Sequence, residues 1–237
     1  MESPENQQFE EETTEKTVPE INEVERKRFV EDSVTISPDS VLYKTLPLKC
    51  NWKFWYLDGE KNKEWMDRLH DLCVLTTVEE FWALIDRIRK PSNLPQCDYS
   101  LFKESIPPVW EERDNKSGGR IVYQLAKTDH ELFNELWLKL MLGMIGDFFG
   151  DATDAICGAV CSSRPKGSKI SIWTQSGADQ EVIKRIGVLM RDLWANHYES
   201  MEKARIFYES HADSQNKQSS VAPHRQYLTG HEYQQTY

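Results

Sequence analysis

The 237-residue sequence lacks the features that mark several large classes of protein. It contains no run of about 18 apolar residues, so no transmembrane helix is expected. Glycine and proline number only 11 and 10, too few for a collagen-like or low-complexity chain. The first residues, MESPENQQFEEE, are polar and acidic, unlike a secretory signal or an Arg-rich transit peptide. With 39% hydrophobic residues, these absences predict a globular protein without a membrane partner.

Cysteine is also scarce and unpatterned. The five cysteines are an odd number and form no C-x-x-C pair. This argues against a disulfide framework or a zinc ribbon, and predicts reduced thiols in a cytoplasmic or nuclear compartment. Cys157 and Cys161 are expected to share one face of a strand, which favours two small buried thiols over a metal site.

Signatures of catalysis are missing as well. The sequence has no G-x-S-x-G, no Walker-type loop, no H-E-x-x-H and no G-x-G-x-x-G. Its six histidines form no metal-ligand spacing with cysteine. The pair Gly118-Gly119 is most simply a turn before a strand. We therefore expect a protein that is not an enzyme and that needs neither a metal nor a cofactor.

The net charge of −10 is unevenly distributed. Residues 1–40 hold twelve acidic and four basic residues, a net charge of −8, which leaves −2 for the remainder. The remainder of the chain is nearly neutral, so it offers no extended basic surface for a long phosphate backbone. It can still hold a short basic site for a few phosphates.

Apolar residues divide the chain into a tail, a domain and a second tail. Residues 1–40 carry too little apolar surface to offset chain ordering, so we expect a disordered acidic tail there. The domain is expected over 41–225, followed by a flexible tail over 226–237. Strands are expected over 46–58, 97–104, 120–126, 156–163, 168–174 and 204–209, and Gly167 is expected at the tip of a hairpin. Helices are expected from the capping signals at Thr76 and Thr77 to Pro91, over 129–149 and over 178–196. Hairpin strands interrupted by three helices predict an α+β fold with the helices on one face of a sheet.

The helix at 129–149 has apolar residues around most of its circumference. An amphipathic surface helix needs only one apolar stripe. Two explanations stay open: the helix is sunk in the core, or it presents a second apolar face to a partner.

Tryptophan occurs in unusual surroundings. Trp65 and Trp110 lie in polar loops, and Glu111 follows Trp110 directly. A basic turn, residues 164–169, precedes the strand that carries Trp173. Alone, each tryptophan could be a packing anchor and the turn a solvated hairpin. Together they offer flat aromatic faces, a carboxylate and several cations, which suit a cationic purine that carries phosphates.

These segments resemble the eukaryotic translation initiation factor 4E family, which binds the mRNA 5′ cap. The resemblance is carried by NWKFWYLDGEKNKEW, TTVEEFWALI, CDYSLFKESIPPVWEERDNKSGGR, ICGAVCSSRPKGSKISIWT and SHAD. It runs from about Leu46 to Arg225. It implies a curved antiparallel sheet of about eight strands with three long helices on the convex face.

The resemblance also implies the residues of a cap site. Trp65 and Trp110 would sandwich 7-methylguanine, whose positive charge adds a cation–π component to stacking. Glu111 would accept hydrogen bonds from the base, and Trp173 would touch the N7-methyl group. The implied phosphate ligands are Arg164 and Lys169, with Lys166 and Arg120 as supporting cations.

A second implied surface would receive a partner helix. In the family it binds the Tyr-x4-Leu-φ peptide of the scaffold factor 4G and of 4E-binding proteins, which would explain the second apolar face of the helix at 129–149. The implied residues are Pro47, Val78, Trp82, Leu138, Leu142 and Gly146. Two departures leave partner preference open, because Lys139 stands where an acid is usual and Leu46 replaces a common His. Ser220 aligns with the family's regulatory phosphorylation serine, although its surroundings, SSVAPHR, differ.

Three functions are compatible with these patterns. The first is an initiation factor, monomeric outside its complexes, that binds capped mRNA and recruits factor 4G. Trp52 and Trp65 favour it, because repressor-type homologues tend to have other residues there. The second is a cap-binding repressor or tethering module, which Lys139 keeps open. The third, a cap-processing hydrolase or methyltransferase, would need a metal cluster or cofactor motif that the sequence lacks.

Overall fold

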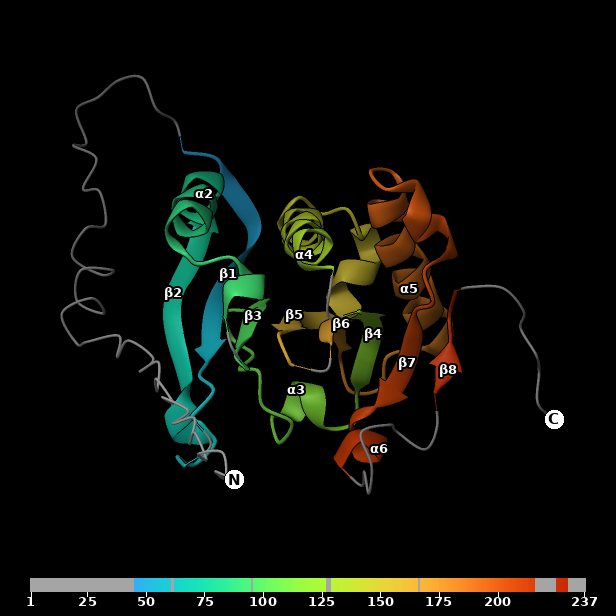
Figure 1. The fold of residues 1–237 in the computed structure, drawn as a ribbon. Coiled ribbons are helices and arrows are strands. Elements are labelled where there is room, and N and C mark those ends of the chain that lie inside the picture. Colours follow the sequence, from blue (N-terminus) through green and yellow to red (C-terminus); the bar gives the residue numbers. More distant parts are fainter. Residues whose placement is uncertain are drawn as a thin grey trace, which may run out of the picture. The chain divides into compact units, whose positions relative to one another are not determined.

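A computed structural model of the chain describes residues 45–60, 62–94, 96–126, 129–165, 167–215 and 225–229. These residues form an eight-stranded sheet in the order β2-β1-β3-β5-β6-β4-β7-β8, and each neighbouring pair is antiparallel. The sheet curves, and the long helices lie together on one of its faces (Figure 1). The expected α+β fold, with an eight-stranded antiparallel sheet, is confirmed.

The eight strands follow the expected ranges with two additions. Their bounds are β1 Pro47–Leu57, β2 Leu69–Thr77, β3 Asp98–Lys103, β4 Gly119–Leu125, β5 Ile156–Ser162, β6 Ser168–Thr174, β7 Phe207–Ser210 and β8 Gln226–Tyr227. Strands β2 and β8 were not expected. Both are edge strands of the sheet, and most residues of β2 are half-buried on both faces, so alternation of apolar and polar residues is weak there.

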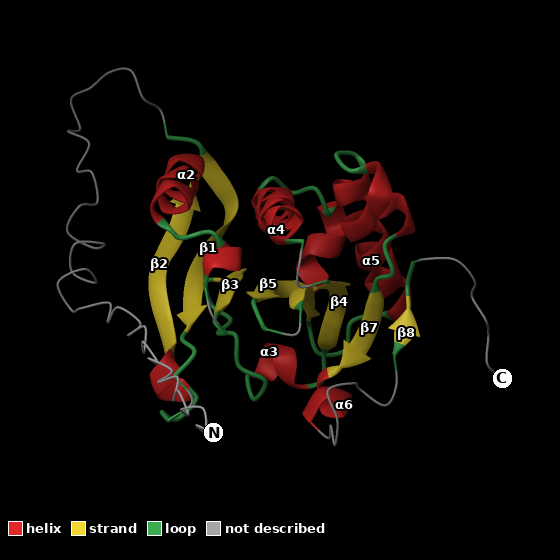
Figure 2. Ribbon diagram, viewed as in Figure 1, coloured by secondary structure: helices red, strands yellow, loops and turns green. Residues whose placement is uncertain are grey.

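Three long helices, α2 Val78–Arg87, α4 His130–Ile145 and α5 Gln180–Ala195, match the expected ones (Figure 2). Helix α2 begins with a capping box in which the Thr77 hydroxyl accepts a hydrogen bond from the Glu80 N–H and the Glu80 carboxylate accepts one from the Thr77 N–H. The short helices are η1 Met66–Arg68, η2 Pro91–Asn93, α3 Arg113–Lys116, η3 Gly150–Ala155, η4 Glu199–Lys203 and α6 His211–Gln215. None of the helices in these ranges combines the length and the apolarity that spanning a bilayer takes.

The main core lies between the long helices and the sheet. Strand β1 alternates as expected: Trp52 and Phe54 enter this core, whereas Trp55 packs against a smaller cluster on the opposite face. Phe102 and Trp173 belong to that smaller cluster. It forms the floor beneath the candidate site.

The two cysteines of β5 correct an expectation. Cys161 belongs to the main core and Cys157 to the smaller cluster, so they do not share a face. A register shift between Ile156 and Gly158 causes this difference. An extra residue in a strand turns the side chains before it to the opposite face of the sheet from the one that regular alternation would give. Burial raises the pKa of the Cys157 thiol to about 12, which makes this thiol unreactive at neutral pH.

The expected boundary at residue 225 is too early. Strand β8 pairs with β7, and Leu228 beyond it is only 3% exposed in the main core. The Thr229 hydroxyl accepts a hydrogen bond from the Ile206 N–H and donates one to the Ala204 carbonyl. Residues 226–229 therefore belong to the domain. The expected tail over 1–40, Lys166, Ser220 and residues 230–237 lie outside the described residues.

Candidate functional site

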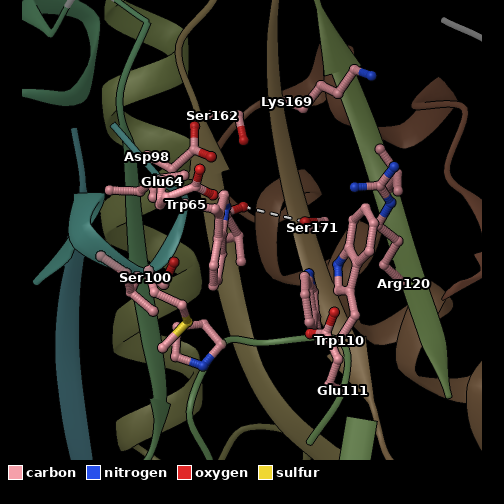
Figure 3. A pocket seen from close by; sticks show the side chains of 17 residues that line it. Glu64, Trp65, Asp98, Ser100, Trp110, Glu111, Arg120, Ser162, Lys169 and Ser171 are labelled. Atoms are coloured by element: carbon pink, nitrogen blue, oxygen red, sulfur yellow. Dashed lines mark hydrogen bonds between the residues drawn. The ribbon is translucent and has the colours of Figure 1, made fainter. Parts of the chain in front are cut away.

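A cavity of about 520 Å³ opens on the face of the sheet that is turned away from the three long helices. Strands β1 to β6 and two loops line it. Six of the eight expected pocket residues are among its lining residues: Trp65, Trp110, Glu111, Trp173, Lys169 and Arg120. Figure 3 shows Trp65 on one side of the cavity, Trp110, Glu111 and Arg120 on the other, and Lys169 toward one end.

The loop that carries Trp65 is tied at its base although Trp65 itself is 40% exposed. The Asp58 N–H donates to the Arg68 carbonyl at 3.0 Å, and Arg68 Nη2 donates to the Asp58 carbonyl at 2.6 Å. The Asp58 carboxylate also accepts from the Glu60 N–H at 2.9 Å and lies 3.1 Å from His70 Nε2. Burial raises the pKa of Asp58, but these two hydrogen bonds outweigh it, so the net shift is downward. An ionised Asp58 thus ties the two ends of the loop together at neutral pH.

The opposite loop carries Trp110 and Glu111 and is held by Asn115. This fully buried side chain donates from Nδ2 to the carbonyls of Pro107 and Val109, at 2.9 and 2.8 Å. The clamp fixes the backbone immediately before Trp110, while Glu111 remains exposed at the cavity. Asn115 was not singled out in the sequence, where it looks like an ordinary turn residue of the polar segment.

Trp173, on β6, forms part of the cavity wall and is only 6% exposed. Its ring meets Phe102 edge-on, with centroids 5.4 Å apart, and lies 4.3 Å from the ring of His211. The same His211 ring stacks on Trp110 at 6.4 Å with an interplanar angle of 24°. Burial and the charge of Arg120 lower the pKa of His211 to about 4. A neutral imidazole therefore supports both tryptophans.

Two of the expected cations, Arg120 and Arg164, are held by carboxylates. Arg120 Nε donates to Glu209 at 2.6 Å, and Lys169 lines the same cavity from β6. Arg164 Nη1 and Nη2 donate to the two oxygens of Asp98 at 2.6 and 3.0 Å. Asp98 lines the cavity, whereas Arg164 is not among the lining residues.

On the helical side, the expected partner surface carries partly exposed apolar side chains. Trp82 of α2 is 43% exposed, and the Val78 N–H donates to the Leu46 carbonyl, which brings the start of β1 beside α2. On α4, Leu138 and Leu142 are half-buried whereas Leu136 and Leu140 are fully buried, so this helix has the second apolar face that the sequence left open. Pro47 and Gly146 are exposed and Val78 is half-buried.

Comparison with known proteins identifies the family. Residues 47–226 match the family model described as eukaryotic initiation factor 4E. Eukaryotic translation initiation factor 4E-1 of Caenorhabditis elegans is 44% identical over 181 residues, which cover 74% of this chain and 85% of that protein. The human eukaryotic translation initiation factor 4E is 39% identical over 181 residues, which cover 76% of this chain and 82% of the human protein.

Solved structures agree with this assignment. Ascaris suum eIF4E-3 in complex with an m2,2,7G cap is 37% identical, with a TM-score of 0.67 over 75% of this chain and 95% of that one. The complex of C. elegans eIF4E-3 with the 4E-binding protein Mextli and a cap analogue is 39% identical, with a TM-score of 0.66 over 73% of this chain and 97% of that one. The chain belongs to the eukaryotic initiation factor 4E family.

Proposed function

We propose that this protein binds the 7-methylguanosine 5′ cap of mRNA in the cavity and recruits the scaffold factor 4G to start protein synthesis. The observation that carries the proposal is the convergence of Trp65, Trp110 and Glu111, from two separate loops, on one cavity. The related structures were solved with m7G or m2,2,7G caps, which supports the same ligand class here.

The two loop tryptophans bind the base. A 7-methylguanine ring is cationic, so two electron-rich aromatic faces attract it more strongly than they attract plain guanine. Glu111 carries a negative charge at the cavity and accepts hydrogen bonds from the N–H groups of the base. Trp173 lies in the cavity wall and contacts the N7-methyl group of the base, which shields this group from water.

Lys169 and Arg120 bind the phosphates from the cavity wall. Arg164 lies next to Asp98 and also binds a phosphate. Its Nη1 and Nη2 donate to the Asp98 carboxylate, so its Nε can donate to a phosphate oxygen. Lys166, two positions after Arg164 in the sequence, is proposed as a further phosphate ligand. This small set of cations suits a short triphosphate and explains how an almost neutral domain can bind an RNA end.

The helical surface binds the partner. We assign Trp82, Leu138 and Leu142 to an amphipathic Tyr-x4-Leu-φ helix of factor 4G or of 4E-binding proteins. A relative solved with the 4E-binding protein Mextli supports this partner class. The assignment extends to Pro47, Val78 and Gly146, while Lys139 at the same helix alters the charge that a basic partner would meet. A tethering module with a vestigial cap site is not favoured, because the cavity keeps its aromatic and acidic groups.

The role is binding and not catalysis, in the cytoplasm, where capped mRNA is translated. A titration of intrinsic tryptophan fluorescence with 7-methyl-GTP and with GTP tests the proposal. We expect saturable quenching by 7-methyl-GTP and far weaker binding of GTP, because GTP lacks the cation–π component. Equal affinity for both nucleotides would contradict the proposal and indicate a site that binds purine nucleotides in general. Mass analysis of the cap analogue after incubation should show it unchanged.

A further inference from the structure

A second groove, of about 370 Å³, lies beside the last residues of β4 and β8 and the first residue of β7. Among its lining residues are Gln124, Lys203, Arg205, Phe207, Arg225 and Tyr227. The groove is distinct from the cavity that carries the proposed cap site, with which it shares no lining residue. Its far edge is β8, the strand that extends the domain beyond the expected boundary at residue 225.

The groove continues from the phosphate end of the cavity. Lys169, which lines the cavity, pairs across β4 and β6 with Gln124, which lines the groove. Val122 of the cavity likewise pairs across β4 and β7 with Phe207 of the groove. Residues directly opposite each other on neighbouring antiparallel strands lie side by side on one face of the sheet. The groove therefore lies directly beside the end of the cavity that carries Lys169.

The groove is basic. Lys203 and Arg205 are exposed, Arg225 completes the set of cations, and no acidic side chain is among the lining residues. Arg225 faces a carboxylate from outside this lining: its Nε lies 3.8 Å from Glu209. Glu209 is thus shared between Arg120 of the cavity and Arg225 of the groove, and one buried carboxylate faces two guanidinium groups.

The groove also presents flat groups suited to stacking. The Arg205 guanidinium lies 4.7 Å from the ring centroid of Tyr227, and the Arg225 guanidinium lies 4.1 Å from that of Phe207. Tyr227 is 44% exposed although it belongs to a strand. Single-stranded nucleic acids are commonly bound by this combination, in which bases stack on aromatic rings and Arg planes while cations follow the phosphates.

We propose that the groove binds the first nucleotides of the mRNA after the cap. The inference rests on the proposed cap function, which places the triphosphate at Lys169. Lys203 and Arg205 bind the phosphates that follow, and a base stacks on Tyr227. The surface is short, in keeping with the nearly neutral domain, so it extends cap recognition by a few nucleotides and does not form a long RNA track.

The test compares three probes on the full-length protein: 7-methyl-GTP, a capped RNA of five nucleotides and the same RNA with a 5′ triphosphate but no cap. We expect the capped RNA to bind several-fold more tightly than 7-methyl-GTP. Arg205→Gln and Tyr227→Ala should each remove most of this gain, roughly a three- to tenfold loss, and leave 7-methyl-GTP binding unchanged. The salt dependence for capped RNA should become shallower by about one unit in Arg205→Gln, because one phosphate contact is lost.

Two matched variants control the result. Tyr227→Phe keeps the ring and should keep the gain, and Lys90→Gln removes an exposed cation beyond the end of α2 and should change nothing. Equal affinity of wild-type protein for 7-methyl-GTP and capped RNA, or an unchanged gain in both groove variants, would overturn the inference. Tighter RNA binding by Arg205→Gln would overturn it too. That result would mean that Arg205 binds an acidic segment of this chain, such as residues 1–40, which competes with RNA. Failure of 7-methyl-GTP itself to bind would instead refute the proposed cap function.

Discussion

Arg120 donates from Nε to the carboxylate of Glu209, 2.6 Å away, at the wall of the cavity. These residues lie on neighbouring strands β4 and β7, directly opposite each other. Glu209 is only 2% exposed, and Arg225 approaches its second oxygen to 3.8 Å. A buried carboxylate that serves two guanidinium groups fixes the direction of Arg120 toward the cavity, and it joins the proposed cap site to strand β8.

Glu209→Gln should therefore destabilise the fold. Gln keeps the shape but removes the charge that both arginines need, so the free energy of unfolding should fall by about 1.5–3 kcal/mol, the usual loss for a charged hydrogen bond. Urea denaturation measures the change. Glu199→Gln, at an exposed position of η4, is the control and should stay within about 0.5 kcal/mol of wild type. Equal effects of the two substitutions would mean that Glu209 contributes nothing special.

Trp65→Ala and Trp110→Ala should each weaken binding of 7-methyl-GTP about ten- to a hundredfold, because each removes one stacking face. Their effects on stability should differ. Trp65 is 40% exposed, whereas Trp110 packs on the smaller cluster and on His211, so only Trp110→Ala should also lower the melting temperature. Calorimetric titration and thermal unfolding give both values. Retention of either variant on a cap resin at wild-type level would contradict the assignment of the stacking pair.

Glu111→Gln should reduce both affinity and selectivity. An amide offers one acceptor oxygen where the carboxylate offers two, and it carries no charge to attract a cationic base. The neighbouring Glu112 provides a matched control, because its side chain caps α3 by accepting from the Arg113 N–H. Competition between 7-methyl-GTP and GTP measures the change. If Glu112→Gln lost as much affinity as Glu111→Gln, the local charge and not a specific contact with the base would explain the preference.

His211 predicts a pH dependence of stability. Its pKa is about 4 in the folded protein and 6.5 as the ordinary value, so between these values the unfolded chain binds the extra proton. Stability is consequently full above about pH 6.5 and falls as the pH is lowered toward 4. One such group can account for up to about 3 kcal/mol.

The measurement is the free energy of unfolding at several pH values between 4 and 7. His211→Asn should flatten the curve in this window, although it also costs stability at neutral pH through lost packing on Trp110 and Trp173. His197→Gln, at an exposed position after α5, should leave the slope as in wild type. An unchanged slope in His211→Asn would show that other groups cause the acid sensitivity.

The sequence predicted the three long helices and six strands, and six of the eight residues expected at the candidate site line the cavity. Trp65 and Trp110 stand out because large aromatic residues are unusual in polar loops, and Glu111 directly follows Trp110. The residues that hold them were not found, because their partners are remote or unremarkable in the chain. Glu209 lies 89 positions from Arg120, and Asn115 acts only through backbone carbonyls.

Strands that lack alternation were missed for a related reason. Edge strand β2 and the two-residue β8 leave much of their surface at the edge of the sheet, so burial imposes little pattern on their sequence. The register shift in β5 is invisible in the sequence and places Cys157 and Cys161 on opposite faces. Arg164 was expected as a phosphate ligand from the family resemblance, and only the structure shows that Asp98 holds its guanidinium group.

Trp82 provides the test of the second surface. The indole is 43% exposed and packs edge-on against Phe81, with ring centroids 5.4 Å apart, so its outer face is accessible on α2. Tryptophans at interfaces are frequent hot spots, and Trp82→Ala should cost at least ~2 kcal/mol in binding of a Tyr-x4-Leu-φ peptide. An exposed side chain contributes little to the core, so the melting temperature should change only slightly.

Trp65→Ala is the reciprocal control, because Trp65 lines the cavity on the face of the sheet opposite the main core, against which α2 packs. Peptide affinity and 7-methyl-GTP affinity are to be measured on both folded variants. We expect Trp82→Ala to lose the peptide and keep the cap analogue, and Trp65→Ala to do the reverse. This double dissociation would establish two independent binding faces, as an adaptor between an mRNA end and a scaffold requires. If Trp82→Ala lost both ligands, Trp82 would be a residue that supports the fold. The assignment of this helical surface to a partner peptide would then be wrong, in line with the unusual Lys139 on α4.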